Sequence, residues 1–223
     1  GGRTVQHPGP DLPRDLRLAR ETGVDLCFTP AADRIYRPGR RTEIHVTGLE
    51  SRLEGATRPT HYAGVALVVL KLLHIVEPQV MILGQKDAQQ ALILERMVED
   101  LDLPVKLVRG ATRREPDGLA MSSRNVYLSP EDRRAAPVLH RALRAARQAA
   151  LAGERSAARL LALIRREIAG EPRVRLDYAA VVNARSLEDL RRVEGRVLIP
   201  IAAYLGRTRL IDNEEFTVPG GRR

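Results

Sequence analysis

The chain has 223 residues, of which 43% are hydrophobic and 29% are charged, a balance typical of a globular protein with one or two buried cores. Its 17 glycines and 14 prolines follow no collagen-like period, and no apolar run reaches the roughly 20 residues of a membrane helix, so fibrous and transmembrane classes are excluded. The formal net charge of +9 suggests nucleic acid, but only 3% of the residues are aromatic and none is tryptophan, so stacking platforms for single strands are sparse. We expect the basic surplus, most of it in residues 113–223, to be a solvated surface with no nucleic-acid or membrane partner.

The chain has a single cysteine, Cys27, so intrachain disulfides and cysteine-based zinc sites are excluded. Cys27 lies in the apolar run from Val24 to Phe28. Its setting predicts a buried thiol in a reducing compartment, and hence a cytoplasmic protein. The first ten residues begin with Gly rather than Met and match neither a signal peptide nor an organised element. We expect the chain to begin partway into a longer protein.

Residues 1–112 show strand and helix patterns in alternation. In chain order, we expect a helix at 13–22, a buried strand at 24–29, a weakly alternating segment at 42–46, a buried helix at 62–76, a strand at 80–83, a helix at 88–102 and a strand at 105–108. The last strand, helix and strand are spaced as in a right-handed crossover, which predicts a parallel sheet.

The pattern changes at RGATRREPDG, residues 109–118, which we interpret as a domain boundary. After it, Ser129 and Pro130 predict the start of a helix of about 20 residues, because serine caps helix N-termini and proline fits the first turn. A second helix follows and ends at Gly170.

Consecutive strands complete this second half. They are expected at 174–182, at 197–205 with an interruption at Pro200, and at 208–211. Helices followed by consecutive strands indicate an α+β domain with an antiparallel sheet. We therefore expect two domains, an α/β domain at 1–112 and a smaller α+β domain at 113–223.

The first candidate site is the segment GQKDAQQ at 84–90, at the carboxyl end of a predicted strand and the start of a helix. Ligands bind at that edge of open α/β sheets, and helix N–H groups beside the ammonium of Lys86 suit a phosphate. The alternative is a purely structural one, in which Asp87 and Gln90 form a capping box and Lys86 is merely exposed. The residues alone leave both interpretations open.

A second candidate is the loop at 117–125, DGLAMSSRN, at the domain junction. Its two hydroxyls and one guanidinium, at Ser122, Ser123 and Arg124, can surround a polyphosphate and neutralise charge as pyrophosphate leaves. The alternative is an interdomain linker with a helix cap. A loop that closes over a nucleotide is expected to move.

A third candidate, EGATRPTHY at 54–62, combines an acid, an arginine and a histidine before the predicted buried helix. His61 alone is also explained as an ordinary residue at a helix start. The other histidines have no companion pattern.

Taken in order, these segments resemble the pantothenate synthetases, the pantoate:beta-alanine ligases of the nucleotidylyltransferase superfamily. The resemblance runs from about residue 7 to residue 213 and rests on LEGATRPTHYAGV, VLKLLHIVEPQ, GQKDAQQ, LAMSSRNVYLSPEDR and TRLIDN. It implies a Rossmann-like nucleotidylyltransferase domain followed by a smaller lid domain, and a homodimer. It also implies a reaction in which pantoate attacks the α-phosphorus of ATP to give pantoyl adenylate and pyrophosphate, with Mg2+ on the phosphates. Beta-alanine then attacks the acyl carbon and expels AMP.

The resemblance carries roles onto particular residues. Lys86, Ser122, Ser123 and Arg124 are the implied catalytic groups. The implied ATP-binding set consists of Gly84, Gln85, Lys86, Asp87, Arg113, Met121, Ser122, Ser123 and Arg124, with Arg113 contacting adenine through its backbone where the family usually has an apolar residue. The implied pantoate pocket consists of Gln90, His61, Arg58 and Glu54, and the residues that would hold the metal stay unassigned.

The chain departs from the family pattern at its front. The family's first strand and its H-x-G-H helix start, which binds ATP phosphates, have no counterpart here, so the nucleotide domain is expected to be incomplete at its N-terminus. Two interpretations stay open. The chain is either a fragment of an active ligase or a noncatalytic remnant, including a basic RNA-associating module that reuses the fold.

Overall fold

The computed structural model describes residues 11–219. The chain divides into two compact units, Gly1–Thr42 and Glu43–Arg223, which are described separately. Within residues 11–219, no helix is both long and apolar enough to cross a membrane.

The first unit contains two helices, α1 (Leu12–Glu21) and α2 (Ala32–Ile35). The carboxylate of Asp11 caps α1 by accepting a hydrogen bond from the backbone N–H of Arg14 at 3.1 Å, and proline occupies the first turn. Gly23 follows the helix with φ of +79°, which a glycine adopts without steric cost. The helix predicted at 13–22 is confirmed.

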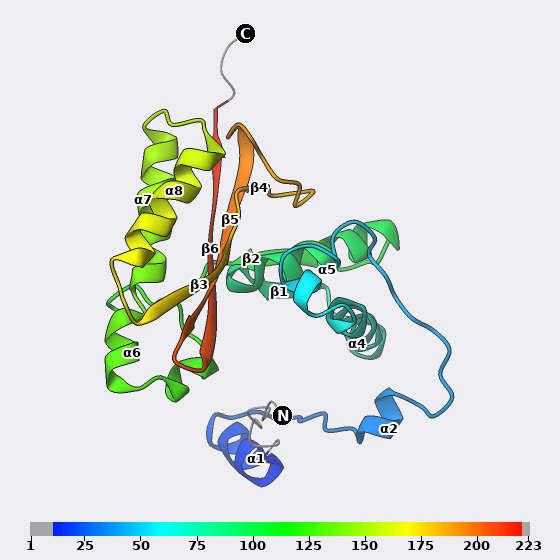
Figure 1. Cartoon of the computed structure of the whole chain (residues 1–223). Coiled ribbons are helices and arrows are strands. Elements are labelled where there is room, and N and C mark those ends of the chain that lie inside the picture. The colour runs from blue at the N-terminus through cyan, green and yellow to red at the C-terminus, as the bar shows by residue number, and fades with distance from the viewer. Residues whose placement is uncertain (1–10, 220–223) are drawn as a thin grey trace. The chain divides into compact units, whose positions relative to one another are not determined.

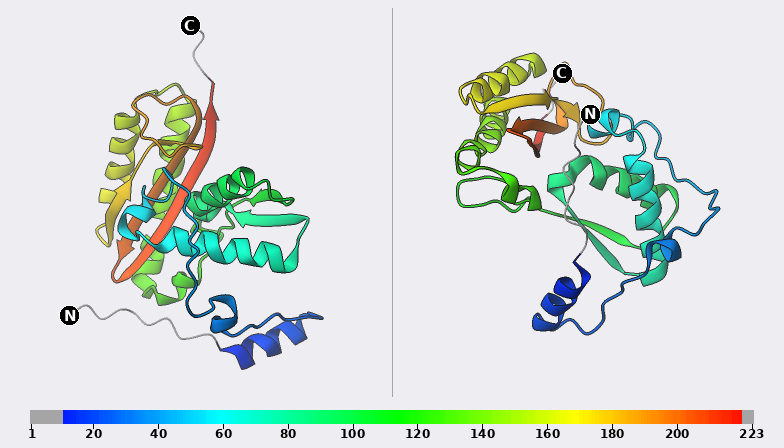
Figure 2. Two further views of the ribbon diagram at one scale, coloured as in Figure 1. Left: turned by 90° about the vertical axis from the view of Figure 1, so that its right-hand side faces the viewer. Right: turned by 60° about the horizontal axis from the view of Figure 1, so that its bottom comes forward.

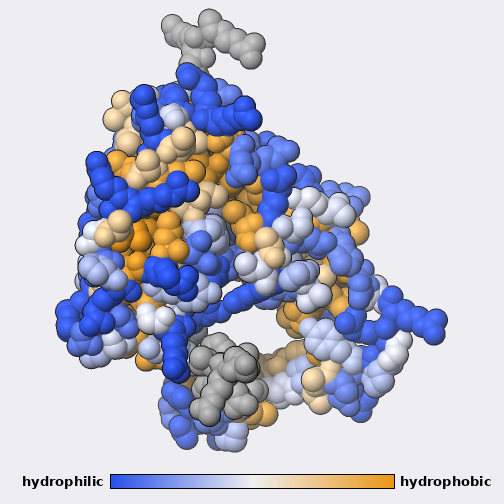
Figure 3. Space-filling model, in the orientation of Figure 1, coloured by the Kyte–Doolittle hydropathy of each residue, from blue (hydrophilic) through white to orange (hydrophobic). Residues whose placement is uncertain are grey.

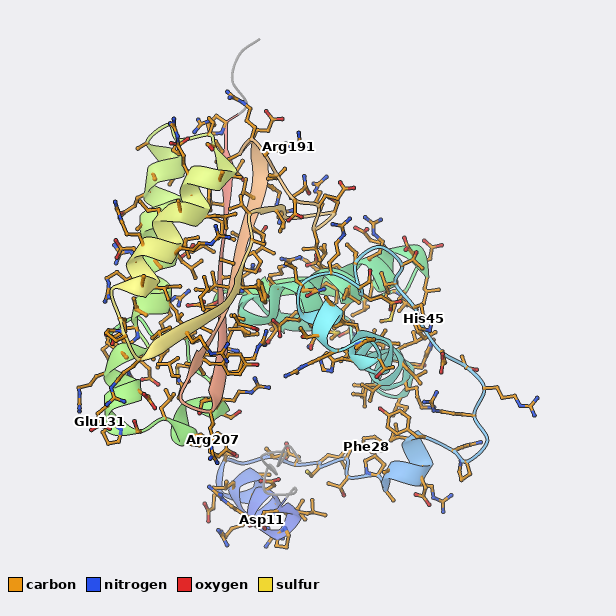
Figure 4. The ribbon with its side chains drawn as sticks, viewed as in Figure 1. Asp11, Phe28, His45, Glu131, Arg191 and Arg207 are labelled. Atoms are coloured by element: carbon orange, nitrogen blue, oxygen red, sulfur yellow. The ribbon has the colours of Figure 1, made fainter. Side chains whose placement is uncertain are left out.

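The buried strand predicted at 24–29 is wrong. These residues form no strand, Leu26 is 86% exposed and Phe28 is 54% exposed; Figure 4 labels Phe28 on this irregular segment. Cys27 is exposed, so the prediction of a buried thiol is wrong as well. A strand depends on backbone hydrogen bonds to a neighbour, and residues 11–42 contain no strand to pair with.

The second unit contains a parallel pair of strands, β1 (Val80–Gly84) and β2 (Lys106–Gly110). A short 3-10 turn, η1 (Gln85–Asp87), and helix α5 (Ala88–Asp100) connect them. The face of α5 turned inward carries Ile93, Leu94 and Met97, all fully buried. The predicted strand, helix and strand with parallel pairing are thus confirmed.

Two further helices precede this pair: α3 (Glu54–Thr57) and α4 (His61–Val76), the latter packed against α5. We predicted a buried helix at 62–76, but only Tyr62, Ala66, Leu67 and Leu73 of α4 are buried, and Val76 is 62% exposed. A helix that packs chiefly against one neighbour buries only the stripe facing it. The weakly alternating segment 42–46 forms no strand.

Later in the second unit, the chain forms three consecutive α-helices: α6 (Pro130–Ala135), α7 (Val138–Leu151) and α8 (Ala157–Ala169). The hydroxyl of Ser129 accepts a hydrogen bond from the N–H of Asp132 at 3.1 Å, so the predicted cap is confirmed; Glu131, in the first turn, is labelled in Figure 4. The single helix of about 20 residues is wrong, because the helix breaks before Pro137. Proline lacks the N–H that a continuous helix would need there.

The antiparallel sheet consists of β3 (Val174–Ala179), β4 (Val182–Asn183), β5 (Gly195–Leu205) and β6 (Thr208–Val218). Central β5 pairs with the other three strands. It runs through Pro200 without the predicted interruption. Proline has no backbone N–H to donate, but the backbone of Pro200 faces Ala180, in the gap between β3 and β4, and its carbonyl accepts a hydrogen bond from the Ala180 N–H. No hydrogen bond between paired strands is therefore lost there. Gly206, with φ of +55°, turns β5 into β6 beside Arg207 (Figure 4).

This sheet lies between two hydrophobic clusters. Helices α7 and α8 lie side by side on one of its faces (Figures 1 and 2), where Ile199 and Ile201 pack with Leu143 and Ile164. The alternate residue Leu198 belongs to the other cluster, which contains α5. In Figure 3, hydrophilic side chains surround the apolar surface over this part of the chain. The domain division at residue 112 stays a prediction.

Candidate active site

A cavity of about 430 Å³ lies within the second unit. Its walls come from α3 and the start of α4, from η1 and the start of α5, from the loop at 119–125 and from strands β5 and β6. The cavity brings together most of the predicted site residues: Glu54, Arg58, His61, Lys86, Asp87, Gln90, Met121, Ser122, Ser123 and Arg124. Gly84, Gln85 and Arg113 do not line it.

Lys86 and Asp87 supply charges of opposite sign to the cavity wall. The ammonium Nζ of Lys86 lies 3.9 Å from Oδ1 of Asp87, and the Lys86 side chain is 21% exposed. Asp87 makes no capping hydrogen bond at the start of α5, so the capping box that we weighed against a ligand role is not formed. Both side chains are therefore available to a ligand in the cavity.

The loop at 119–125 adds hydroxyls and a guanidinium to the lining of the cavity. It leads into a short 3-10 helix, η2 (Ser123–Tyr127), where the Ser122 hydroxyl accepts a hydrogen bond from the Arg124 N–H at 3.2 Å. The Arg124 guanidinium donates to the carbonyl of Arg209 on β6 at 3.2 Å. Met121 of the loop is 53% exposed and Val126 of η2 is 78% exposed, so this segment presents apolar surface that residues 11–219 leave uncovered.

An ion pair anchors the base of this loop. Arg114 makes a bidentate contact with Asp212 of β6, at 2.6 and 3.1 Å, and also donates to the carbonyl of Gly118 at 3.1 Å. Asp212 is almost fully buried, so the pair lies in a low-dielectric setting where charge-assisted hydrogen bonds are strong. The loop is thus fixed to β6 at its base while its tip stays exposed.

Gly118 has no space for a side chain. Its φ is +94°, and a Cβ there would lie 2.4 Å from Nδ1 of His140 on α7. We expect Gly118→Ala to lower the free energy of unfolding by about 1–3 kcal/mol, through backbone strain and overpacking. Urea denaturation measures it, with Gly64→Ala, where a Cβ meets nothing within 4 Å, as the control for a permissive glycine. Equal stability of Gly118→Ala and the unsubstituted chain would contradict this view of the loop base.

Glu54 and Arg209 form a bidentate ion pair at another wall of the cavity, with 13% and 11% of their side chains exposed. The two oxygen–nitrogen distances are 2.6 and 2.8 Å, and Arg209 also donates to Asp177 at 2.9 Å. Burial by itself would raise the pKa of Glu54, but the hydrogen bonds and positive charge of Arg209, with a further hydrogen bond from Tyr178, outweigh it and lower that pKa. Glu54 is therefore held as a carboxylate.

The buried amide of Gln89 holds the turn that presents Glu54. Its oxygen accepts from the Glu54 N–H and from the Tyr62 hydroxyl, both at 3.1 Å. Its nitrogen donates to the carbonyls of Leu49 and Arg52, at 2.9 and 2.7 Å. Both N–H donors and both acceptor sites of the amide are used, so Gln89 holds residues 49–54 against α5.

Sequence reasoning missed several residues that support the cavity, namely Tyr62, Gln89, Arg114, Tyr178, Arg209, Asp212 and Asn213. The segment TRLIDN at 208–213 contributed to the family resemblance, but no role was given to its members. A signal was present in its charged and amide side chains: Arg209 lies within the strand predicted at 208–211, and Asp212 and Asn213 follow it directly. Among residues 11–219, no group of three or more His, Cys, Asp or Glu side chains could hold a metal ion.

Comparison with known proteins identifies the family. The family model described as pantoate-beta-alanine ligase matches residues 7–215. The pantothenate synthetase of Roseiflexus sp. (strain RS-1) is 52% identical over 203 residues, which cover 91% of this chain and 73% of that protein. The pantothenate synthetase of Carboxydothermus hydrogenoformans is 48% identical over 204 residues, covering 91% of this chain and 72% of that protein.

Solved structures agree. The crystal structure of pantothenate synthetase from Thermus thermophilus has a TM-score of 0.86 at 44% identity, covering 96% of this chain and 78% of that chain. Pantoate-beta-alanine ligase from Francisella tularensis, complexed with beta-gamma ATP and beta-alanine, has a TM-score of 0.67 at 30% identity, covering 92% and 70%. The expected fold class, a parallel α/β sheet with a smaller antiparallel domain, is thereby confirmed. The chain belongs to the pantoate-beta-alanine ligase family of enzymes.

Proposed function

We propose that the chain joins (R)-pantoate to beta-alanine in two steps driven by ATP. A carboxylate oxygen of pantoate attacks the α-phosphorus, and the bond to pyrophosphate breaks. The amine of beta-alanine then attacks the acyl carbon of pantoyl adenylate, loses a proton and expels AMP. The observation that carries this proposal is the single cavity that joins Lys86 and the Ser122–Arg124 loop to Glu54, Arg58, His61 and Gln90.

Different residues of the cavity lining suit different parts of this chemistry. Lys86 and Arg124 supply positive charge that suits a triphosphate, and the hydroxyls of Ser122 and Ser123 add hydrogen-bond donors. Arg58 suits the carboxylate of pantoate, and Gln90 and His61 are further polar groups of the same lining. Gly84 and the backbone of Arg113 stay proposed contacts of the nucleotide from outside the cavity wall.

Mg2+ fits this donor set as a companion of the phosphates. The cation is usually held by one or two carboxylates together with phosphate oxygens, and Asp87 offers a carboxylate that makes no helix cap. When bound, Mg2+ would neutralise phosphate charge.

We further propose a homodimer in the cytoplasm, with no nucleic-acid partner. The remnant and RNA-associating alternatives receive no support from relatives that are named as synthetases.

The test is product analysis with the protein expressed from its whole gene. With ATP, Mg2+ and pantoate alone, we expect pyrophosphate to form in amounts no greater than the enzyme's own concentration. Addition of beta-alanine should then start turnover and yield AMP and pantothenate in equal amounts. Formation of ADP and phosphate in place of AMP and pyrophosphate would contradict the adenylate route.

The exposed loop should respond to the nucleotide. We expect amide hydrogen exchange across residues 117–126 to slow when ATP and Mg2+ are added, because the phosphates give Ser122, Ser123 and Arg124 new partners and bring the loop tip down. Exchange in α7 should stay the same and serves as the internal reference. Equal exchange in the loop with and without saturating nucleotide would rule out the closing role.

A further inference from the structure

Asn213 reaches from β6 to the turn that carries Lys86. Its side-chain nitrogen donates to the carbonyl of Gln85 at 3.0 Å and to the carbonyl of Lys86 at 2.8 Å. Asn213 is only 5% exposed, so these two bonds are shielded from water. Two consecutive carbonyls of η1 are thereby fixed by one amide from a strand 127 and 128 positions away in sequence.

The side chain of Gln85 completes this contact from the other direction. Its nitrogen donates to Oδ1 of Asn213 at 3.3 Å and to Glu215 at 3.0 Å, while its oxygen accepts from Arg109 at 3.1 Å. The amide is therefore occupied by protein partners and turned away from the cavity. Gln85, predicted to bind ATP, has only its backbone left for that role.

A charged network lies behind this pair of amides. Arg109 on β2 makes a bidentate contact with Glu95 of α5, at 2.5 and 2.6 Å, and a third contact with Glu215 of β6 at 3.0 Å. Glu215 in turn pairs with Arg196 of β5. These ion pairs connect helix α5 with strands β2, β5 and β6. Asn213, on the same strand as Glu215, makes the hydrogen bond to the backbone of Lys86.

We infer that Asn213 is a positioning residue that sets Lys86 against the phosphates of the nucleotide. The inference rests on the proposed function. A lysine side chain is flexible, so the place of its ammonium depends on where its backbone is held, and a misplacement of about 1 Å can cost about 10²-fold in rate. Without Asn213, both carbonyls would have to find other partners, and the short turn would be free to shift.

The first test needs no ligand. We compare Asn213→Asp, which keeps the shape but cannot donate, with Thr217→Ala, an exposed position on the same strand. Amide exchange of residues 85–88 should accelerate at least 10-fold in Asn213→Asp and stay unchanged in the control, while β5 keeps its protection in both. Asn213→Ser, with one short donor, should lie between. Unchanged exchange at 85–88 in Asn213→Asp would overturn the inference.

The second test measures what the turn does for the ligand. ATP and adenosine are titrated calorimetrically against the protein expressed from its whole gene. Asn213→Ser should weaken ATP binding about 10-fold and leave adenosine binding unchanged, because only ATP carries phosphates for Lys86. Equal weakening of both ligands would mean that Asn213 serves only the fold. No ATP binding by the unsubstituted protein, together with accelerated exchange in Asn213→Asp, would refute the proposed function while the turn-holding role stood.

A double-mutant cycle shows whether Asn213 acts through Lys86. If it does, Lys86→Ala combined with Asn213→Ser should bind ATP no more weakly than Lys86→Ala alone. Weakening in the double variant equal to the product of the two single effects would mean that Asn213 acts independently of Lys86, and it would overturn the inference.

Discussion

Lys86→Ala is expected to slow pantoate-dependent pyrophosphate release by about 10²-fold or more. Negative charge moves onto the leaving pyrophosphate, and a preorganised cation beside it stabilises the transition state more than the ground state. The Lys86 ammonium has its aspartate neighbour at 3.9 Å, beyond a close hydrogen bond, so it can turn to a phosphate without breaking a tight ion pair. The loss should fall mainly on kcat rather than on KM for pantoate.

Single-turnover release of pyrophosphate measures this step directly, in the protein expressed from its whole gene. Lys106→Ala, which removes an exposed lysine from β2, is the matched control and should keep the full rate. Lys86→Arg should restore only part of the rate, because a planar guanidinium does not place its charge where the ammonium lies. Full-speed adenylation by Lys86→Ala would remove Lys86 from the catalytic groups.

Local sequence signals predicted those parts of the fold that local chemistry decides. Ser129 caps its helix as expected, because a cap depends on residues two or three positions away; Asp11 caps α1 in the same way, although we had not singled it out. The β1, α5 and β2 unit followed from period and spacing alone. The segment 24–29 has the composition of a strand, but a strand also needs a neighbour, and residues 11–42 supply none.

The residues of the candidate site that we predicted are likewise those with local sequence signals. Lys86 and the Ser122–Arg124 loop stood out because they are contiguous polar groups at predicted element ends. Arg209 and Asn213 did not, because their partners Glu54 and Lys86 lie 155 and 127 positions away. Such pairings come from the way β6 passes the turns of the preceding elements, and period and spacing do not encode that path.

Gln85 is a further case in which distant contacts decide the role of a residue. It is adjacent to Lys86, and the family resemblance assigned both residues to ATP binding. Neighbouring residues in a short turn point in different directions, so one lines the cavity while the other joins the charged network under β6. Only the contacts from Arg109 and Glu215 show which of the two faces the ligand.

The Glu54–Arg209 pair should be the most sensitive point of the second unit's stability. Arg209→Met is expected to lower the free energy of unfolding by about 2–4 kcal/mol, somewhat less than in a fully buried pair, because the Glu54 carboxylate left without its partner keeps some contact with water. Glu54→Gln should cost less, because Arg209 keeps its contact with Asp177. Substituting both residues together should cost less than the sum of the single effects, since neither charge is then left alone.

The stability difference between the unsubstituted chain and Glu54→Gln should depend on pH in a defined direction. The folded-state pKa of Glu54 lies below its unfolded value, so the pair's contribution is fully present above the unfolded pKa of about 4.3 and is lost as pH falls through the folded pKa. Urea titrations of the unsubstituted chain and Glu54→Gln should therefore show a constant difference between about pH 6 and pH 8 that shrinks in acid. Arg165→Gln, which removes an exposed cation from α8, is the control and should change the free energy of unfolding little. A difference that persists undiminished at about pH 3 would show that Glu54 stabilises the fold by packing and not by its charge.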